Sequence, residues 1–152
     1  MKPARFDYHR ARDLPDALSA LQDPNAKIIA GGQSLGPMLN LRLARPGLLI
    51  DIGRVAELRA VREDGVFLRI GAAVTHAAIE DGAAQAAARG FLNFVASHIA
   101  YRPIRNRGTI GGSLAHADPA ADWPTALTAL DAEAELASAK GRRTVAVSQL
   151  IA

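Results

Sequence analysis

Residues 102–119 read RPIRNRGTIGGSLAHADP, and this glycine-rich stretch is the most informative part of the chain. It holds three glycines within five positions, with Thr109 and Ser113 beside them and three arginines upstream. Glycines let the main chain adopt positive φ and let a ligand approach the backbone closely. Successive N–H groups in such a turn converge on an anion, and neighbouring hydroxyls add donors. The stretch therefore predicts an anion-binding loop, although a tight turn with a solvated basic flank has the same composition.

A second glycine pair lies earlier in the chain, in the stretch IIAGGQSL at residues 28–35. An apolar, strand-like run leads into Gly31 and Gly32, and a hydroxyl and a helix-like run follow. A strand, glycines and a helix start together form an anion site from backbone N–H groups and the helix dipole. Neither stretch has the spacing of a P-loop or of a dinucleotide-binding fingerprint. Two such loops in one small chain suggest a ligand with two phosphates.

The composition excludes several classes of protein. A chain of 152 residues fits one domain, or two small lobes that share a core. It has no cysteine, which excludes disulfides, cysteine-bound zinc and cysteine-bound iron–sulfur clusters within the chain. A net charge of +3 with 5% aromatic residues and no long basic run does not favour nucleic-acid binding. No signal-peptide pattern or apolar run of about 20 residues is visible, so we expect a soluble cytoplasmic protein.

The order of strand-like and helix-like segments predicts an α+β fold with two lobes, at residues 1–53 and 54–152. In the first lobe we expect an edge strand, a helix capped by Asp13, a buried strand, a helix stopped by Pro46 and an apolar strand, at residues 6–9, 14–21, 27–30, 35–43 and 48–52. In the second we expect two hairpins and three helices, at residues 58–70, 132–147, 75–89, 91–100 and 123–130. Helices and hairpins are grouped rather than alternating, which favours α+β over a doubly wound sheet.

The two glycine stretches together resemble a known family. Residues 30–34 (AGGQS) and 109–114 (TIGGSL), in this order, are similar to the FAD-binding medium subunit of the molybdenum hydroxylases, which include bacterial carbon monoxide dehydrogenase and xanthine dehydrogenase. The resemblance covers nearly the whole chain, from Phe6 to Thr144. It implies a two-lobed FAD-binding domain with the cofactor between the lobes. The family usually has asparagine where this chain has Ser113, which keeps a hydrogen bond but lacks the second function of the amide.

The resemblance assigns FAD binding to three groups of residues. In the first lobe it places the pyrophosphate against Gly31, Gly32, Gln33, Ser34 and Leu35, and the adenosine side against Lys27, Ile28 and Ile29. Ala30, between these groups, is also a predicted cofactor-binding residue. From the second lobe it brings Thr109, Ile110, Gly111, Gly112 and Ser113. It also places Asp122 on the ribityl or ribose hydroxyls, since a carboxylate accepts from two hydroxyls. The same residue is a candidate N-cap for the helix that follows, and both roles are compatible.

The resemblance also implies the activity and the partners. Electrons from a molybdenum cofactor on a large subunit would pass through 2Fe-2S clusters on a small subunit to FAD on this chain. They would continue to an acceptor such as NAD or a quinone, within a heterotrimer or its dimer. Two other functions fit the glycine loops. One is a non-catalytic FAD-binding or interaction module, and the other is an unrelated enzyme that binds nucleotide phosphates.

Family members continue beyond the last residue of this chain, so the resemblance implies a medium subunit truncated at its C-terminus, with the C-terminal domain missing. In such a fragment, we expect the apolar side chains near the end to be exposed and to favour self-association. These side chains are Val145, Val147, Leu150 and Ile151.

Other notable side chains have less specific interpretations. Arg102, Arg105 and Arg107 either balance the charge of a diphosphate or bind a partner subunit, but a solvated face accounts better for at least two of them. Trp123 is expected to anchor the core. Neither His76 nor His116 has the neighbours of a metal site, and no nucleophile–base pair is evident. We therefore expect no metal ligand and no catalytic residue in this chain.

Overall fold

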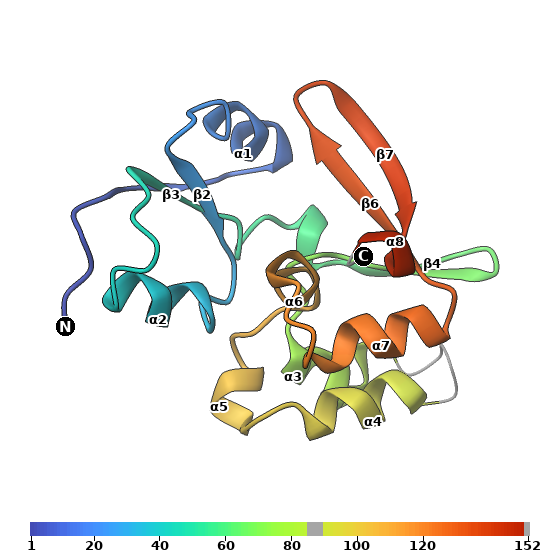
Figure 1. Cartoon of the computed structure of the whole chain (residues 1–152). Helices are drawn as coiled ribbons and strands as arrows, with labels where there is room; N and C mark the ends of the chain where they lie inside the picture. The colour runs from blue at the N-terminus through green and yellow to red at the C-terminus, as the bar shows by residue number, and fades with distance from the viewer. Residues whose placement is uncertain (85–89, 151–152) are drawn as a thin grey trace.

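The computed structural model describes residues 1–84 and 90–150, which form two parts (Figure 1). The first part is a three-stranded parallel sheet with the order β1-β3-β2 and two helices. Its elements are β1 (Asp7–Arg10), α1 (Leu14–Ala20), β2 (Ala26–Ile29), α2 (Leu35–Asn40) and β3 (Leu48–Asp51). Parallel neighbours need crossover connections, which α1 and α2 with their flanking loops supply. The expected edge strand, first helix and apolar strand are all confirmed.

The central position of β3 explains the burial of the first part. Leu49 and Ile50 are almost fully buried, and Ile50 packs with Ala17 of α1 and with Val55. β2 lies at the edge of the sheet, and Ile28 on it is 39% exposed. The prediction of a buried strand at residues 27–30 is therefore wrong about burial, because β3 rather than β2 takes the central place.

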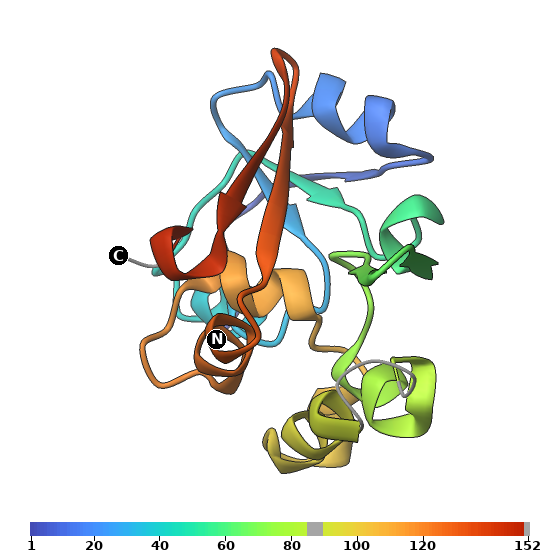
Figure 2. The ribbon, with the colours of Figure 1, turned by 90° about the vertical axis from the view of Figure 1, so that its right-hand side faces the viewer.

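The second part combines two antiparallel hairpins with a group of short helices (Figures 1 and 2). The first hairpin and the helices are η1 (Glu57–Arg59), β4 (Val61–Asp64), β5 (Phe67–Ile70), α3 (His76–Ala78), η2 (Ile79–Ala83), α4 (Phe91–His98), α5 (Arg102–Arg105), α6 (Ile110–His116) and α7 (Asp122–Ala129). The second hairpin and the last helix are β6 (Glu133–Ser138), β7 (Gly141–Ala146) and α8 (Val147–Leu150). Both predicted hairpins are confirmed, and the mixture with the parallel sheet confirms the α+β class.

The core of the second part surrounds Trp123, whose side chain is completely buried. Ile79, Leu92, Ile110 and Val147 pack in the same cluster, so it joins η2, α4, α6, α7 and α8. The prediction of Trp123 as a core anchor is confirmed. The division into lobes at residue 53 stays a prediction, and Val55, which follows it, packs in the core of the first part.

Two expectations about this part need correction. Thr75 caps the next helix as predicted, accepting from the N–H of Ala78 at 3.1 Å, but α3 soon becomes the π-helical turn η2. Gly82 in this turn has φ of 105°, and residues 85–89 of the predicted helix lie outside the described residues. Val147 is buried in α8 rather than exposed on a strand, while Ile151 lies outside the described residues. Among residues 1–84 and 90–150, no helix has the length and apolarity needed to span a membrane.

Candidate functional site

The two glycine stretches meet in space. We call residues 30–35 the first glycine segment and residues 107–113 the second. A Cβ atom built on Gly31 would lie 2.7 Å from the carbonyl carbon of Arg107 and 2.8 Å from the Cα of Gly108, and would be closer still to the Arg107 carbonyl oxygen. Real Cβ atoms do not approach backbone atoms this closely, so only glycine fits at position 31. The contact places the first glycine segment directly against the start of the second.

The first glycine segment joins β2 to α2 and presents unused donors. Gly32 has φ of 69°, a conformation that favours glycine, and the side chain of Gln33 donates to the carbonyl of Gly31 at 3.1 Å. The N–H groups of residues 31–34 donate to no acceptor within residues 1–84 and 90–150. Consecutive unpaired N–H groups before a helix suit phosphate oxygens. The segment therefore has the free backbone donors that a phosphate group requires, and the predicted cofactor contact stays a prediction.

The second glycine segment differs from the predicted loop. Gly111 and Gly112 lie in the first turn of α6, and neither has positive φ. Their N–H groups are already used, by the carbonyl of Ala72 at 3.0 Å and by the hydroxyl of Thr109 at 3.1 Å. A Cβ on Gly111 would lie 2.7 Å from the Cα of Ala72. Close packing, rather than a turn that collects N–H groups, explains this glycine, and the prediction of such a turn is wrong.

Residues 72–76 hold the second glycine segment in place. The N–H of His76 donates to the carbonyl of Gly108 at 2.9 Å, and the N–H of Ile110 donates to the carbonyl of Val74 at 3.1 Å. Thr75 and Thr109 form an isolated antiparallel bridge between these bonds. The second segment is therefore fixed to the residues that follow β5. In Figure 1, α5 and α6 lie on the side of the second part that faces the first part.

His76 and Trp123 form a buried pair beside the second segment. The indole N–H of Trp123 donates to Nδ1 of His76 at 3.0 Å, and His76 is 6% exposed. An indole nitrogen only donates, so the neutral imidazole carries its hydrogen on Nε2. Burial, together with the charge of Arg105, lowers the pKa of His76 to about 4, against a smaller opposing effect of Asp122. The ring is therefore neutral near pH 7.

Asp122 occupies a different position in its helix from the one predicted. It is the first residue of α7, and the N-cap is Ala121, so the N-cap prediction is wrong. A carboxylate in the first turn still interacts favourably with the helix dipole. Asp122 directly precedes Trp123, which donates to His76, and His76 in turn donates to Gly108. Asp122 is therefore linked to the second glycine segment through these two hydrogen bonds.

Two of the upstream arginines bind carboxylates of this chain. Arg105 binds Glu80 through two N–H groups at 2.8 and 3.0 Å and also donates to the carbonyls of Ile99 and Ala100. Arg102 binds Asp81 at 2.5 Å and Glu80 at 2.7 Å. These arginines lower the pKa of both carboxyls: hydrogen bonds from Arg105 contribute most at Glu80, and those from Arg102 contribute most at Asp81. Arg102 and Arg107 are exposed, as expected for at least two of the three arginines, whereas the side chain of Arg105 is only 12% exposed.

The replacement Arg105→Lys is expected to lower the thermal unfolding midpoint more than Arg142→Lys does. Lysine keeps the charge but lacks the planar fork that holds Glu80 and two carbonyls together. Arg142 also forms ion pairs, but its side chain is 52% exposed, and solvent weakens such pairs. Differential scanning fluorimetry compares the two variants. Equal midpoints would contradict a structural role for the Arg105 contacts.

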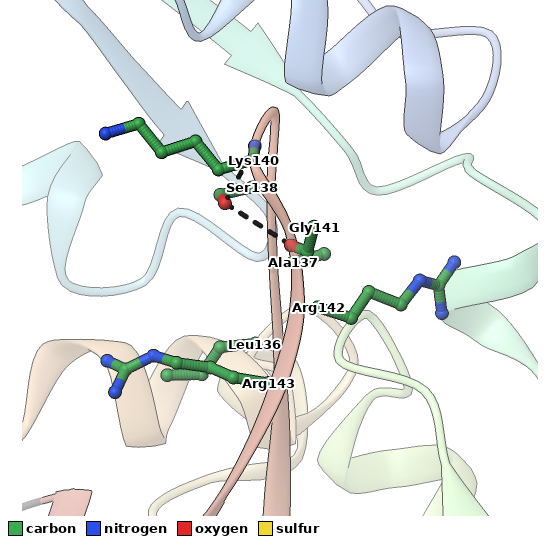
Figure 3. A pocket seen from close by; sticks show the side chains of 7 residues that line it. All are labelled: Leu136, Ala137, Ser138, Lys140, Gly141, Arg142 and Arg143. Carbon is green, nitrogen blue, oxygen red and sulfur yellow. Dashed lines mark hydrogen bonds between the residues drawn. The ribbon is translucent and has the colours of Figure 1, made fainter.

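A hollow lies elsewhere, on the β6–β7 hairpin (Figure 3). Lys140 and Arg143 point to one side of the hairpin and Arg142 to the other. Ser138 closes the turn by donating to the carbonyl of Gly141 at 3.3 Å. None of the residues that line this hollow is a predicted site residue. Across residues 1–84 and 90–150, no group of three or more acidic, histidine or cysteine side chains is placed to hold a metal ion.

Sequence reasoning missed the supports of the site. Ala72 and His76 contact the second glycine segment, and the Glu80–Arg105 pair fixes α5 just before it, yet nothing in the sequence pattern assigns them these roles. His76 and Trp123 lie 47 positions apart, beyond any helical or strand periodicity. In β2, which leads into the first glycine segment, Lys27 and Ile28 are exposed, so a ligand can reach them.

These features define a two-part α+β protein whose parts meet at two glycine segments, one of them with unpaired backbone donors before a helix. A family model described as "FAD binding domain in molybdopterin dehydrogenase" matches residues 4–152. The chain belongs to this family.

Sequence relatives and solved structures support membership in this family. The chain is 46% identical to the 6-hydroxypseudooxynicotine dehydrogenase complex subunit alpha of Paenarthrobacter nicotinovorans, over 99% of this chain and 52% of the relative. It is 42% identical to the carbon monoxide dehydrogenase medium chain of Hydrogenophaga pseudoflava, over 95% of this chain and 51% of that one. The fold matches quinoline 2-oxidoreductase from Pseudomonas putida 86 with a TM-score of 0.93 at 40% identity, over 97% of this chain and 52% of the other. The chain thus spans about half the length of these relatives.

Proposed function

We propose that this chain is the FAD-binding part of an electron-transfer subunit in a molybdenum-containing hydroxylase or dehydrogenase. Membership in the family supports FAD as the cofactor. Among the residues, the main support is the contact between the two glycine segments. The same membership argues against an unrelated enzyme that binds nucleotide phosphates. When bound, FAD supplies a carrier that takes up electrons from a donor and passes them to an acceptor.

The residues of this chain would bind and orient the cofactor. Backbone N–H groups of the first glycine segment would hold the pyrophosphate, with Gln33 keeping the turn closed through its bond to Gly31. Lys27, Ile28 and Ile29 would contact the adenosine side. The second segment would contribute the surface of Gly111, Gly112 and Ser113 rather than free N–H groups. Thr109 and Ile110 are buried and would hold that surface in place, and Asp122 would accept from ribityl or ribose hydroxyls.

The proposal extends to the partners. We propose a large subunit with the molybdenum cofactor and a small subunit with 2Fe-2S clusters, assembled with this subunit as a heterotrimer or its dimer. Relatives described as subunits or medium chains of dehydrogenases support a multi-subunit enzyme. The electron acceptor, such as NAD or a quinone, and a cytoplasmic location stay predictions.

The purified protein is expected to bind FAD without a covalent bond, because the chain has no cysteine to form a thioether and no family pattern supports attachment through a histidine. Titration with FAD should quench flavin fluorescence, and acid precipitation of the complex should release all the flavin to the supernatant. A chain that leaves free FAD unchanged contradicts the proposed function, and yellow colour that stays in the pellet contradicts the noncovalent link.

A second measurement separates an electron-transfer subunit from a non-catalytic FAD-binding module. Bleaching of the flavin absorption by a substrate is expected only when the molybdenum and iron–sulfur subunits are present. Flavin that remains oxidised in the complete complex, while the molybdenum subunit turns over with an artificial acceptor, favours the non-catalytic module.

A further inference from the structure

We infer that His76 is a positioning residue for FAD, whose imidazole ring supports Gly108 and connects the second glycine segment to the start of α7. The inference rests on the proposed function, because FAD is the ligand whose affinity it concerns.

One edge of the imidazole ring lies directly against Gly108. A Cβ atom built on Gly108 would lie 2.7 Å from Nε2 and 2.8 Å from Cδ2 of His76. Gly108 has no positive φ, so the ring, rather than the backbone conformation, excludes a side chain there. The backbone adds a second link, since the N–H of His76 donates to the Gly108 carbonyl at 2.9 Å.

The other edge of the ring is held by α7. Trp123 donates to Nδ1 at 3.0 Å, and because its side chain is fully buried in the core, it fixes the orientation of the ring. The charged groups that act on His76 are Arg105 from α5 and Asp122 from α7. His76 therefore touches or neighbours two separate places predicted to bind FAD, the second glycine segment and Asp122.

A double-mutant cycle with FAD as the probe tests this contact. In an otherwise wild-type chain, Gly108→Ala is expected to weaken FAD binding about tenfold or more, because the new methyl group collides with the ring. His76→Ala is expected to weaken it to a similar degree by removing the support. In the His76→Ala background the methyl group enters the vacated space, although the Ile104 carbonyl oxygen still lies 3.3 Å from it. Gly108→Ala should then cost several-fold less than in the wild-type background. Fluorescence titration gives all four affinities.

Matched variants separate positioning from general destabilisation. Ile79→Val trims a fully buried side chain of the same core and is expected to lower the unfolding midpoint without changing FAD affinity. Trp123→Phe keeps most of the bulk but removes the donor, so it should weaken FAD binding even if His76→Ala fails to fold.

Three outcomes overturn the inference. Gly108→Ala has the same cost in both backgrounds, His76→Ala or Trp123→Phe binds FAD as the wild type does, or Ile79→Val weakens FAD binding as much as they do. A wild-type chain that does not bind FAD overturns the proposed function as well, whereas unchanged variants of a chain that binds FAD overturn the inference alone.

Discussion

The replacement Gly31→Ala is expected to weaken FAD binding at least about 100-fold, or about 3 kcal/mol. The added methyl group would overlap the backbone at Arg107 and Gly108, which cannot move aside as a side chain can. The two glycine segments must then separate, and the unpaired N–H groups of the first segment lose their position relative to the second. Isothermal titration calorimetry with FAD measures the loss.

Gly36 supplies the matched control for this experiment. It lies in α2, a few residues beyond Gly31, and a Cβ atom built there meets no atom within 4 Å. Gly36→Ala should keep the affinity for FAD and leave the unfolding midpoint equal or higher, because alanine favours helices. If Gly31→Ala binds FAD as tightly as Gly36→Ala does, the contact between the segments is not needed for the site.

Acidification is expected to destabilise the folded protein by roughly 3 kcal/mol through His76 alone. The pKa of His76 is about 4 in the folded chain, mainly because of burial, against an ordinary value of 6.5. Between these values the unfolded chain binds a proton that the folded chain does not, so stability falls as the pH falls through this window. Urea unfolding at several pH values between 4 and 7 measures the slope.

Two variants identify the source of that slope. His76→Leu should be less stable at pH 7, since it leaves the Trp123 N–H without its acceptor, but its stability should change less between pH 6.5 and pH 4.5. Ile79→Val, which trims the same core without removing a titratable group, should keep the wild-type slope. The pKa values of Glu80 and Asp81 are lowered in the folded chain, so their contribution to stability is lost as the pH falls below their ordinary values of 4.5 and 3.8, at the acidic end of the His76 window and beyond it. A wild-type slope in His76→Leu would assign the effect to other groups.

Local signals in the sequence predicted most of the secondary structure. Asp13 caps α1 as expected, accepting from the N–H of Asp16 at 2.8 Å, and Thr75 caps α3. The hairpin β6–β7 follows from two strand-like runs around Gly141, which has φ of 129°. Each of these features depends on residues only a few positions apart, so composition and spacing were sufficient to find them.

Features that depend on distant residues were not predictable in the same way. The edge position of β2 follows from its pairing with β3, which the alternation of side chains does not reveal. The glycines at 111 and 112 disfavour a helix locally, yet α6 forms because Ala72 lies against it and Thr109 caps it. The Trp123–His76 and Arg105–Glu80 contacts join side chains far apart in the chain and leave no periodic pattern.

The meeting of Gly31 with Arg107 also has a consequence for the order of folding. Several hydrogen bonds of the first segment join close neighbours: Gln33 bonds Gly31, and the N–H groups of Gly36 and Met38 donate to Gly32 and Ser34. The contact of Gly31 with Arg107, in contrast, must wait for the chain between the two segments to be arranged. Contacts between distant residues form late because the loop entropy is lost before they contribute. The ability to bind flavin is therefore expected to appear in the last kinetic phase of refolding, after the helical circular dichroism signal has recovered. Flavin fluorescence in a stopped-flow experiment would then report when the fold is complete.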